Sequence, residues 1–312
     1  MLFNLVDQLG PIFLLVAVGF GLAKIGLVTR ASIEGLTKMT FWTLIPATLF
    51  VTISGNRVSE LFNLSIWLAY YGAVAITAIS VFIMLRMSKA NTRPEAIVLA
   101  FGAIFSNIGM LGIPVVDILF GHEGLLVLAT ILCIHAISLL TPTILLLEWT
   151  RNRSGNPTAI IGNTLRAQVC NPIIIAILCG VVFASLEVSL PKFAMTFFGM
   201  LKAAMPPIAL MLIGAGIYGQ KLRGNLGASI IGAAAKVCLM PGLVFLIGTL
   251  LHVPMQSLAP AIIIAALPPG VNSVLMASSY ETASERTATT MLVATVLSLI
   301  ILPVLAVILA FD

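Results

Sequence analysis

Long apolar runs separated by short polar segments make up most of the chain. Ten of these runs are long enough to cross the hydrocarbon core of a bilayer as helices, which takes about 20 apolar residues each. The expected spans are residues 11–27, 33–53, 65–87, 94–120, 124–149, 165–186, 191–219, 226–251, 257–280 and 288–311. The pattern predicts an all-α polytopic membrane protein with ten transmembrane helices.

Two of the ten runs, the fourth and the ninth, are interrupted near their middle by polar or helix-weakening residues. These residues are Ser106, Asn107, Gly109, Gly112 and Pro114 in the fourth run, and Pro268, Pro269, Gly270, Asn272 and Ser273 in the ninth. A single Pro or Gly in a membrane helix is usually an ordinary kink. Two broken spans in matching positions of two halves instead predict the midplane binding site of a secondary transporter.

An internal repeat relates the two halves of the chain. A shift of 161 residues places Gly10-Pro11-Ile12 on Asn171-Pro172-Ile173, and it also places Gly19 on Gly180, Pro46 on Pro207, Gly109 on Gly270 and Pro142 on Pro303. Each half holds five expected spans, and an odd number requires the second half to be inserted upside down. We therefore expect two inverted five-helix repeats, residues 1–150 and 164–312, joined by a cytoplasmic linker at 151–163, with broken helices 4 and 9 crossing.

The basic residues are distributed unevenly between the two sides of the predicted membrane. Alternate connections place twelve on one side and two, Arg57 and Lys192, on the other. The twelve are Lys24, Arg30, Lys38, Arg86, Lys89, Arg93, Arg151, Arg153, Arg166, Lys221, Arg223 and Arg286. By the positive-inside rule the larger set is cytoplasmic, which puts both termini outside. Because Lys24 is the first basic residue, we expect the opening run to be a retained span and not a signal peptide.

The interrupted spans predict a pocket for negative charge. A break in the membrane frees backbone groups that need protein or water as partners, so it indicates a cavity. The helical half after each break directs free N–H groups and the positive end of its dipole toward the midplane. The interrupting residues named above are therefore the predicted substrate-binding set, and the side chains of Asn107 and Asn272 add hydrogen-bonding groups at that depth.

Four titratable residues inside or near the spans are further candidates. An intramembrane lysine is a functional hypothesis by default, so Lys236 is added to the substrate-binding set, although it could instead donate to backbone carbonyls freed near Pro206, Pro207 and Pro241. Lys202 is an alternative counter-charge that could also extend to the interface. Asp117 could serve coupling or face water. His135 could relay protons, although a lone histidine on an apolar helix is more often a packing residue.

Composition agrees with a membrane protein and excludes several other classes. The chain is 60% hydrophobic and 9% charged, whereas soluble domains carry about 25% charged residues. The net charge of +5 is explained by topology and does not indicate nucleic-acid binding. Neither a Walker motif nor HExxH, GxSxG or CxxC is present, and the GxGxxG letters at 214–219 end an apolar span. We expect no enzyme activity, no catalytic residues, no metal site and no cofactor, with H⁺ or Na⁺ as a coupling ion.

Four segments carry a resemblance to a known family. They are LIPATLF at 44–50, SNIGMLGIPV at 106–115, KVCLMP at 236–241 and ALPPGVNS at 266–273. With these, the whole chain resembles the auxin efflux carrier family, and most of all its short-loop bacterial members, the malonate or malate permeases, and we expect it in the inner membrane. The resemblance implies a dimerising scaffold of spans 1, 2, 6 and 7, and a transport unit of spans 3, 4, 5, 8, 9 and 10 that moves like an elevator. It places the crossing point at 107–114 and 268–273.

Three functions follow as hypotheses. The first is a secondary transporter of small organic anions, mono- or dicarboxylates such as malonate or malate, working by alternating access as a homodimer in the lipid bilayer. The second is a sodium-coupled symporter of a larger amphipathic anion, because the bile-acid symporters have a similar fold. The third is a membrane receptor or assembly subunit that transports nothing.

Overall fold

The computed structural model describes residues 2–56, 63–88, 90–150, 157–220 and 226–309. These residues are almost entirely helical, and the β-pairing among them is one isolated bridge. Six described helices are long and apolar enough to cross a membrane, and three shorter apolar helices cover 10–24, 172–185 and 255–266. Large apolar side chains such as Leu14, Phe193 and Ile300 are exposed on the outer surface, as expected where lipid is the solvent. The protein is therefore a multi-pass helical membrane protein.

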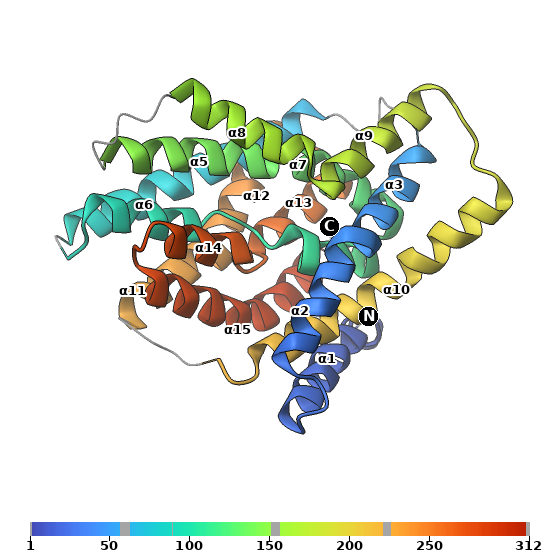
Figure 1. Ribbon diagram of the computed structural model, residues 1–312, viewed down its shortest axis with the longest axis horizontal. Coiled ribbons are helices and arrows are strands. Elements are labelled where there is room, and N and C mark those ends of the chain that lie inside the picture. The colour runs from blue at the N-terminus through green and yellow to red at the C-terminus, as the bar shows by residue number, and fades with distance from the viewer. Residues whose placement is uncertain (1, 57–62, 89, 151–156, 221–225, 310–312) are drawn as a thin grey trace.

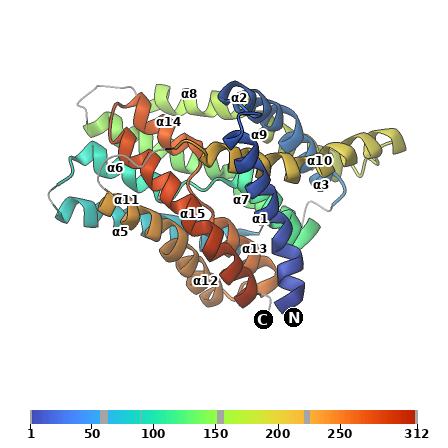
Figure 2. The ribbon, with the colours of Figure 1, turned by 90° about the horizontal axis from the view of Figure 1, so that it is seen from below.

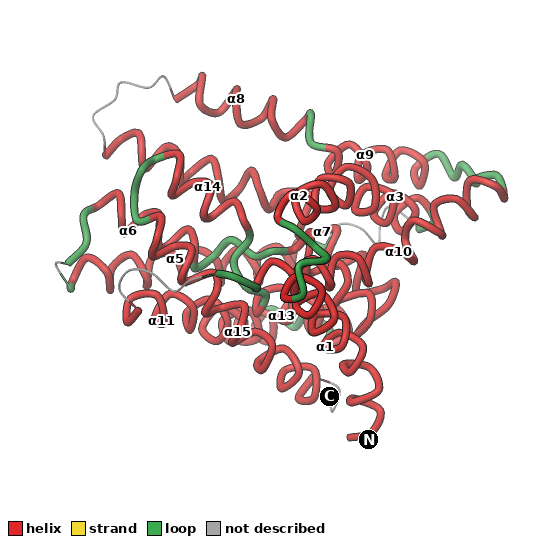
Figure 3. Tube along the Cα trace, turned by 60° about the horizontal axis from the view of Figure 1, so that its bottom comes forward, coloured by secondary structure: helices red, strands yellow, loops and turns green. Residues whose placement is uncertain are grey.

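Figure 1 shows the arrangement of the helices along the chain, and Figure 3 shows the short loops between them. In chain order the helices, with η marking a wide π-helical turn, are α1 (Leu2–Lys24), α2 (Arg30–Met39), η1 (Thr40–Leu44), α3 (Ile45–Ser54), α5 (Leu64–Met87), α6 (Arg93–Gly102), η2 (Ile108–Gly112), α7 (Ile113–Thr150), α8 (Pro157–Val169), α9 (Pro172–Ser185), α10 (Lys192–Ile217), α11 (Leu226–Ala234), η3 (Ala235–Leu239), α12 (Met240–Leu250), α13 (Met255–Ala266), α14 (Val271–Ser279) and α15 (Ser284–Leu309).

Polar residues at the helix starts explain where several helices begin. The side chain of Thr92 accepts a hydrogen bond from the Glu95 backbone while the Glu95 side chain accepts from the Thr92 backbone, which is a complete capping box for α6. Asn63 caps α5 and Asn171 caps α9 through their side-chain oxygens. Each cap satisfies N–H groups that lack an intrahelical acceptor. The entry points of these helices are therefore encoded locally.

The structure differs from the sequence-based expectation around the linker and the sixth span. Residues 157–163, expected as linker, belong to α8, whereas residues 151–156 lie outside the described residues. The sixth expected span began at Leu165, but α8 ends at Val169 and a new helix, α9, begins at Pro172. The reason is local, because Asn171 supplies a cap and Pro172 occupies the first helical position that proline favours. The continuous apolar helix here is consequently 14 residues long.

A non-helical residue separates the fourth and fifth expected spans. Gly121 has φ 59° and ψ −141° inside the long element α7, so the chain kinks sharply there. This backbone conformation is accessible to glycine because it lacks a Cβ atom. The kink lies between the expected spans at 94–120 and 124–149, where the apolar pattern places their boundary.

The helices form two groups with α7 between them. Figure 2 shows α1, α2, α3, α9 and α10 on one side and α5, α6, α11, α12, α14 and α15 on the other. In the first group α1 packs on α10 and α3 packs on α9, while in the second α12 packs on α5 and α11 on α15. Arg286 at the start of α15 forms an ion pair with Glu95 and donates to Asn91 Oδ1 at 2.5 Å, which ties α15 to the start of α6.

Two glycines permit very close contact between α1 and α10. A Cβ atom on Gly19 would lie 1.9 Å from the backbone oxygen of Met211, and one on Gly214 would lie 1.9 Å from the backbone oxygen of Val16. Small residues of this kind let membrane helices approach until their backbones touch. The contact between α1 and α10 therefore depends on the absence of side chains at these two positions.

Alanine at either contact glycine is expected to destabilise the protein by about 1–3 kcal/mol, the usual cost of overpacking. Gly19→Ala and Gly214→Ala should each lower the unfolding temperature in detergent. Gly21→Ala and Gly216→Ala are matched controls in the same helices, because no atom lies within 4 Å of the added Cβ. Thermal unfolding of the four variants tests this, and equal stability of contact and control variants would contradict it.

Candidate functional site

Two breaks in the helices cross near the middle of the molecule. The first lies between α6 and η2, at 103–107, and the second lies between α13 and α14, at 267–270. They form an antiparallel bridge in which the Asn107 N–H donates to the Pro268 carbonyl and the Gly270 N–H donates to the Phe105 carbonyl, each at 2.9 Å. Each break thus supplies partners for backbone groups that the other has freed, as a low-dielectric environment requires.

The sequence explains most of this crossing. Pro268 and Pro269 have no N–H and so end α13, while Gly270 and Gly112 allow close approach of the two segments. A Cβ on Gly270 would lie 3.1 Å from Phe105 Cδ1, and one on Gly112 would lie 2.9 Å from Leu267 Cδ1. The chain is interrupted at Pro268, Pro269 and Gly270 as predicted, whereas Asn272 and Ser273, also assigned to the interruption, lie in the first turn of α14.

The break of the fourth span lies earlier than expected. Gly109 and Gly112 belong to the wide helical turn η2, and Pro114 lies in the first turn of α7. Because η2 runs directly into α7, with the Ile113 N–H donating to the Ile108 carbonyl, Pro114 lies inside a helical segment, where its missing N–H costs one backbone hydrogen bond. The glycines therefore serve packing inside a helix, and the open segment is 103–107.

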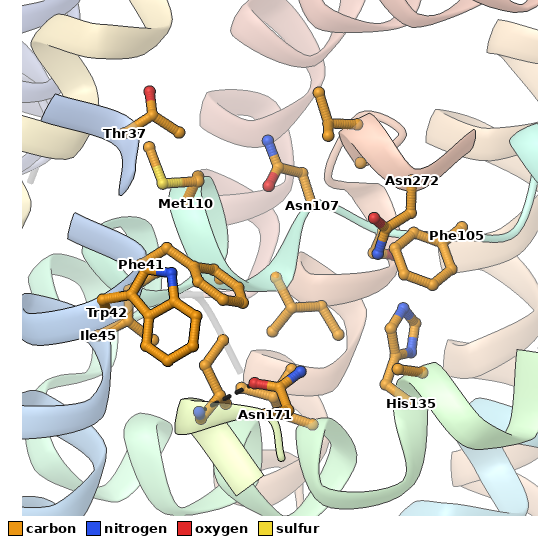
Figure 4. A pocket seen from close by; sticks show the side chains of 18 of the residues that line it. Thr37, Phe41, Trp42, Ile45, Phe105, Asn107, Met110, His135, Asn171 and Asn272 are labelled. Carbon is orange, nitrogen blue, oxygen red and sulfur yellow. Dashed lines mark hydrogen bonds between the residues drawn. The ribbon is translucent and has the colours of Figure 1, made fainter. Parts of the chain in front are cut away.

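A cavity of about 450 Å³ lies beside the crossing. Both breaks line it, together with α2, η1, α3, α7, α9 and α10. Figure 4 shows Phe41 and Trp42 on one side, Asn107 and Asn272 near the crossing, and His135 below Phe105. Its volume falls in the range of small-molecule sites, and an apolar lining with few polar groups is typical of them.

The predicted site residues separate into two groups. Those that line the cavity are Ser106, Asn107, Gly109, Gly270, Asn272 and His135. Those outside its described lining are Gly112, Pro114, Pro268, Pro269, Ser273, Lys236, Lys202 and Asp117. The structure therefore brings polar residues of both breaks together at the cavity. Most prolines and glycines of the two motifs lie outside the cavity lining.

Most lining residues were not among the predicted site residues, and four of them carry charged, aromatic or amide side chains on the opposite side from the crossing. Lys38, Phe41 and Trp42 come from α2 and η1, and Asn171 comes from the start of α9. One signal could have identified Asn171, because the 161-residue shift pairs it with Gly10 beside a matched proline. The other three face the crossing only after the chain folds, and no local pattern distinguishes them.

The two asparagines are the polar side chains best placed to bind a ligand. Asn107 and Asn272 are half-buried, and no hydrogen bond of either amide group is found within the described part of the chain. Each stands at the start of a helical half, next to N–H groups that have no intrahelical acceptor. Ser106 differs, because its Oγ lies 3.0 Å from the Tyr70 hydroxyl. The free donors therefore converge on one end of the cavity.

Lys236 is fully buried but does not line the cavity. Its Nζ donates to the Ala265 carbonyl and lies 3.5 Å from Met240 Sδ. In a continuous helix that carbonyl would accept from residue 269, which is a proline without an N–H. The lysine therefore replaces the missing donor at the negative end of α13. Lys236 therefore serves a freed carbonyl, as the structural alternative expected, but the proline that frees it is Pro269 and not Pro206, Pro207 or Pro241.

Lys202 and Asp117, two candidates for coupling, are partners of each other. Lys202 Nζ lies 3.8 Å from Asp117 Oδ1, and both side chains are partly exposed. The pair joins α10 to α7. A partly exposed pair of this kind contributes at most about 1 kcal/mol to stability. The pair is of interest because it links the two helix groups, not because it stabilises the fold.

His135 is packed among aromatic rings at the edge of the cavity. Its ring centroid lies 4.9 Å from that of Phe105, 6.0 Å from that of Tyr70 and 6.5 Å from that of Tyr71. The imidazole is 2% exposed, and neither ring nitrogen has a hydrogen-bond partner of normal geometry within the described residues.

Comparison with known proteins gives a consistent picture. Residues 5–306 match the family described as "Membrane transport protein". A protein of Rhizobium meliloti (strain 1021) named "Putative malonate transporter" is 23% identical over 293 residues, covering 92% of this chain and 90% of that protein. "Uncharacterized transporter YfdV" of Escherichia coli (strain K12) is 24% identical over 310 residues, covering 96% of both chains.

Replacing Lys236 with methionine is expected to lower stability, because the Ala265 carbonyl would be left buried without a donor. The cost of such a group is about 1–3 kcal/mol. Lys202→Met is the matched control and should cost less than about 1 kcal/mol. Thermal unfolding in detergent tests both. If Lys236→Met unfolded normally but lost ligand binding, the structural role of Lys236 would be wrong.

Proposed function

Because the chain belongs to the membrane transport protein family, the auxin efflux carrier family that its motifs resemble, we propose that it is a secondary transporter of small organic anions. The substrates are mono- or dicarboxylates such as malonate or malate. The observation that carries this proposal is the cavity at the crossing, where the starts of two helical halves and the unpaired amides of Asn107 and Asn272 converge.

The electrostatics of the crossing favour an anion. The starts of η2 and α14 each carry about half a positive elementary charge from the helix dipole. The opposing negative end of α13 is occupied by the buried amino group of Lys236, which donates to the Ala265 carbonyl. No Asp or Glu occurs among the described lining residues, and Lys38 at the exposed rim adds a positive charge. A carboxylate would therefore meet hydrogen-bond donors and no repelling charge.

We infer that the chain consists of two inverted repeats of five helices. The 161-residue shift carries Gly19 to Gly180 and Phe50 to Met211, and the contacts obey the same exchange. Gly19 packs on the Met211 backbone, and Gly180 packs against the Phe50 backbone oxygen, 3.3 Å from an added Cβ. The shift also carries Asn107 to Pro268, and these two residues are hydrogen-bonded to each other. Matched residues that pair lie close to a symmetry axis.

The positions of the two chain ends support the expectation that both termini lie on the same side of the membrane, which we take to be an inner membrane. Figures 2 and 3 show that α1 begins and α15 ends on the same side of the molecule, as an even number of spans requires. The cavity rim includes Lys38, which belongs to the basic set assigned to the cytoplasm by the positive-inside rule. We infer that this conformation is open to the cytoplasm.

Movement of one helix group against the other would give alternating access. The cavity lies between α2, η1, α3, α9 and α10, the proposed scaffold side, and α7 with the two breaks, the proposed transport side. The Lys202–Asp117 pair joins the same two sides. In an elevator-like cycle the crossing would carry the anion past the scaffold, and a homodimer of scaffolds would hold the fixed part in the bilayer.

Replacing either cavity asparagine with leucine is expected to reduce uptake. Each variant removes a charge-assisted hydrogen bond, worth about 1.5–3 kcal/mol, or roughly 10- to 100-fold in affinity. Uptake of labelled malonate by proteoliposomes containing Asn107→Leu or Asn272→Leu measures the effect. Asn56→Leu is the matched control, because Asn56 lies outside the described cavity lining. Normal uptake by both cavity variants, with the protein properly inserted, would contradict the proposal.

The same assay tests the transporter class and its coupling. Counterflow of malonate or malate by purified protein is expected, and failure across a broad panel of organic acids would favour the receptor or assembly subunit. Flux measured at varied pH and varied sodium separates proton coupling, sodium coupling and uncoupled exchange. Strict sodium dependence with a larger amphipathic anion would favour the symporter alternative.

Cross-linking the two sides is expected to stop transport. In a variant with Cys133, Cys170, Cys179 and Cys238 replaced by serine, a thiol cross-linker joining Asp117→Cys to Lys202→Cys should block uptake reversibly. A cross-link between Glu148→Cys and Tyr280→Cys is the control, because the Tyr280 hydroxyl donates to Glu148 at 2.9 Å within the proposed transport side. Unchanged uptake with complete cross-linking of the first pair would contradict movement between α7 and α10.

A further inference from the structure

The side chain of His135 is a buried polar group at the largely apolar cavity, and neither ring nitrogen has a hydrogen-bond partner among the described residues. His135 lines the cavity and is buried. Burying such a group without a partner costs about 1–3 kcal/mol, and buried polar groups are normally bonded. A group that is buried, unpaired and turned to a cavity points to a ligand atom as its missing partner.

The surroundings hold the imidazole in one orientation. Phe105, Tyr70 and Tyr71 pack around the ring, and the Tyr71 hydroxyl donates at 2.7 Å to the Ile131 carbonyl, one turn earlier on α7. Figure 4 shows the ring directed from α7 toward Phe105 and Asn272. The hydrogen bonds of an imidazole lie in the plane of the ring, at its edge. The imidazole therefore presents its nitrogens in a fixed direction.

The protonation of the ring follows from its neighbours. No carboxylate lines the described part of the cavity, and a buried charge without such a partner is strongly disfavoured, so the imidazole is neutral. A neutral imidazole has one N–H and one bare nitrogen. Whichever ring nitrogen carries the hydrogen, the other is a bare acceptor that needs a donor as its partner.

The bare nitrogen of His135 accepts a hydrogen bond, whereas the other polar groups of the proposed anion site donate hydrogen bonds. The helix starts and the NH₂ groups of Asn107 and Asn272 donate hydrogen bonds, and a carboxylate can satisfy all of them. A carboxylate cannot donate to the bare nitrogen of His135. A hydroxyl group on the same ligand can, because it carries a hydrogen of its own. The cavity is therefore complementary to a molecule that has both groups.

We propose that His135 accepts a hydrogen bond from a hydroxyl group of the substrate, so that the cavity selects hydroxycarboxylates over the same acids without the hydroxyl. This inference rests on the proposed function and names the substrate class of the same cavity. His135 then acts as a specificity-determining residue that contacts the substrate. Acids that lack the hydroxyl leave the buried nitrogen unpaired and bind less tightly.

The test compares acids that differ by one hydroxyl group, tartronate with malonate and malate with succinate. Binding to the purified full chain is measured by calorimetry and transport by counterflow. We expect the wild type to prefer the hydroxy acid about tenfold, the value of one hydrogen bond of about 1.4 kcal/mol. His135→Phe keeps the ring but removes the acceptor and should bring the ratio close to one. His135→Gln keeps an acceptor and should retain most of the preference.

The ratio between paired acids is measured within each variant, so partial loss of folded protein cancels. Equal affinity for both acids in the wild type would overturn the inference while malonate counterflow still supports the proposed transporter. An unchanged preference in His135→Phe would also overturn it and would assign the hydroxyl to another acceptor. Failure of all four acids to bind or exchange would contradict the proposed function itself, and this inference with it.

Discussion

The constraint on which this structure depends is that backbone groups freed inside a membrane must find partners within the protein. Two helices are interrupted at mid-length, and each would expose several N–H and C=O groups to a medium without water. The breaks cross and bond to each other through Asn107, Pro268, Phe105 and Gly270. The crossing thereby satisfies part of the backbone and leaves the first N–H groups of two helical halves available. The same geometry that stabilises the fold also creates the site.

Charged and polar residues around the crossing have separate tasks. Lys236 completes the end of α13 from a position outside the cavity, and Lys202 pairs with Asp117 between two helix groups. Neither therefore needs the substrate as a counter-ion. At the crossing the proposed site offers uncharged donors, and Lys38 adds a charge only at the exposed rim. His135 differs from these residues, because neither ring nitrogen has a hydrogen-bond partner among the described residues.

Small residues determine how closely the helix groups approach. Gly19 and Gly214 allow backbone contact between α1 and α10, and Gly180 allows a similar contact between α9 and α3. These contacts lie on the side proposed as scaffold, whereas Gly112 and Gly270 lie at the crossing. Glycines with the same sequence signature thus serve two purposes. Those between helices fix a rigid framework, and those at the breaks bring two segments together beside the cavity.

The sequence by itself determined the membrane class, the family and the break at Pro268–Gly270, because apolar length, proline and glycine act locally, and it named Asn107 and Asn272, which line the cavity. It misplaced the start of the sixth span, where Asn171 begins a new helix, and it extended the fourth break into residues that are helical. Only the tertiary structure decided that Lys236 serves a carbonyl, that Lys202 and Asp117 pair, and that Lys38, Phe41, Trp42 and Asn171 face the cavity. Such contacts join residues far apart in the chain, so their partners exist only after the helices have packed.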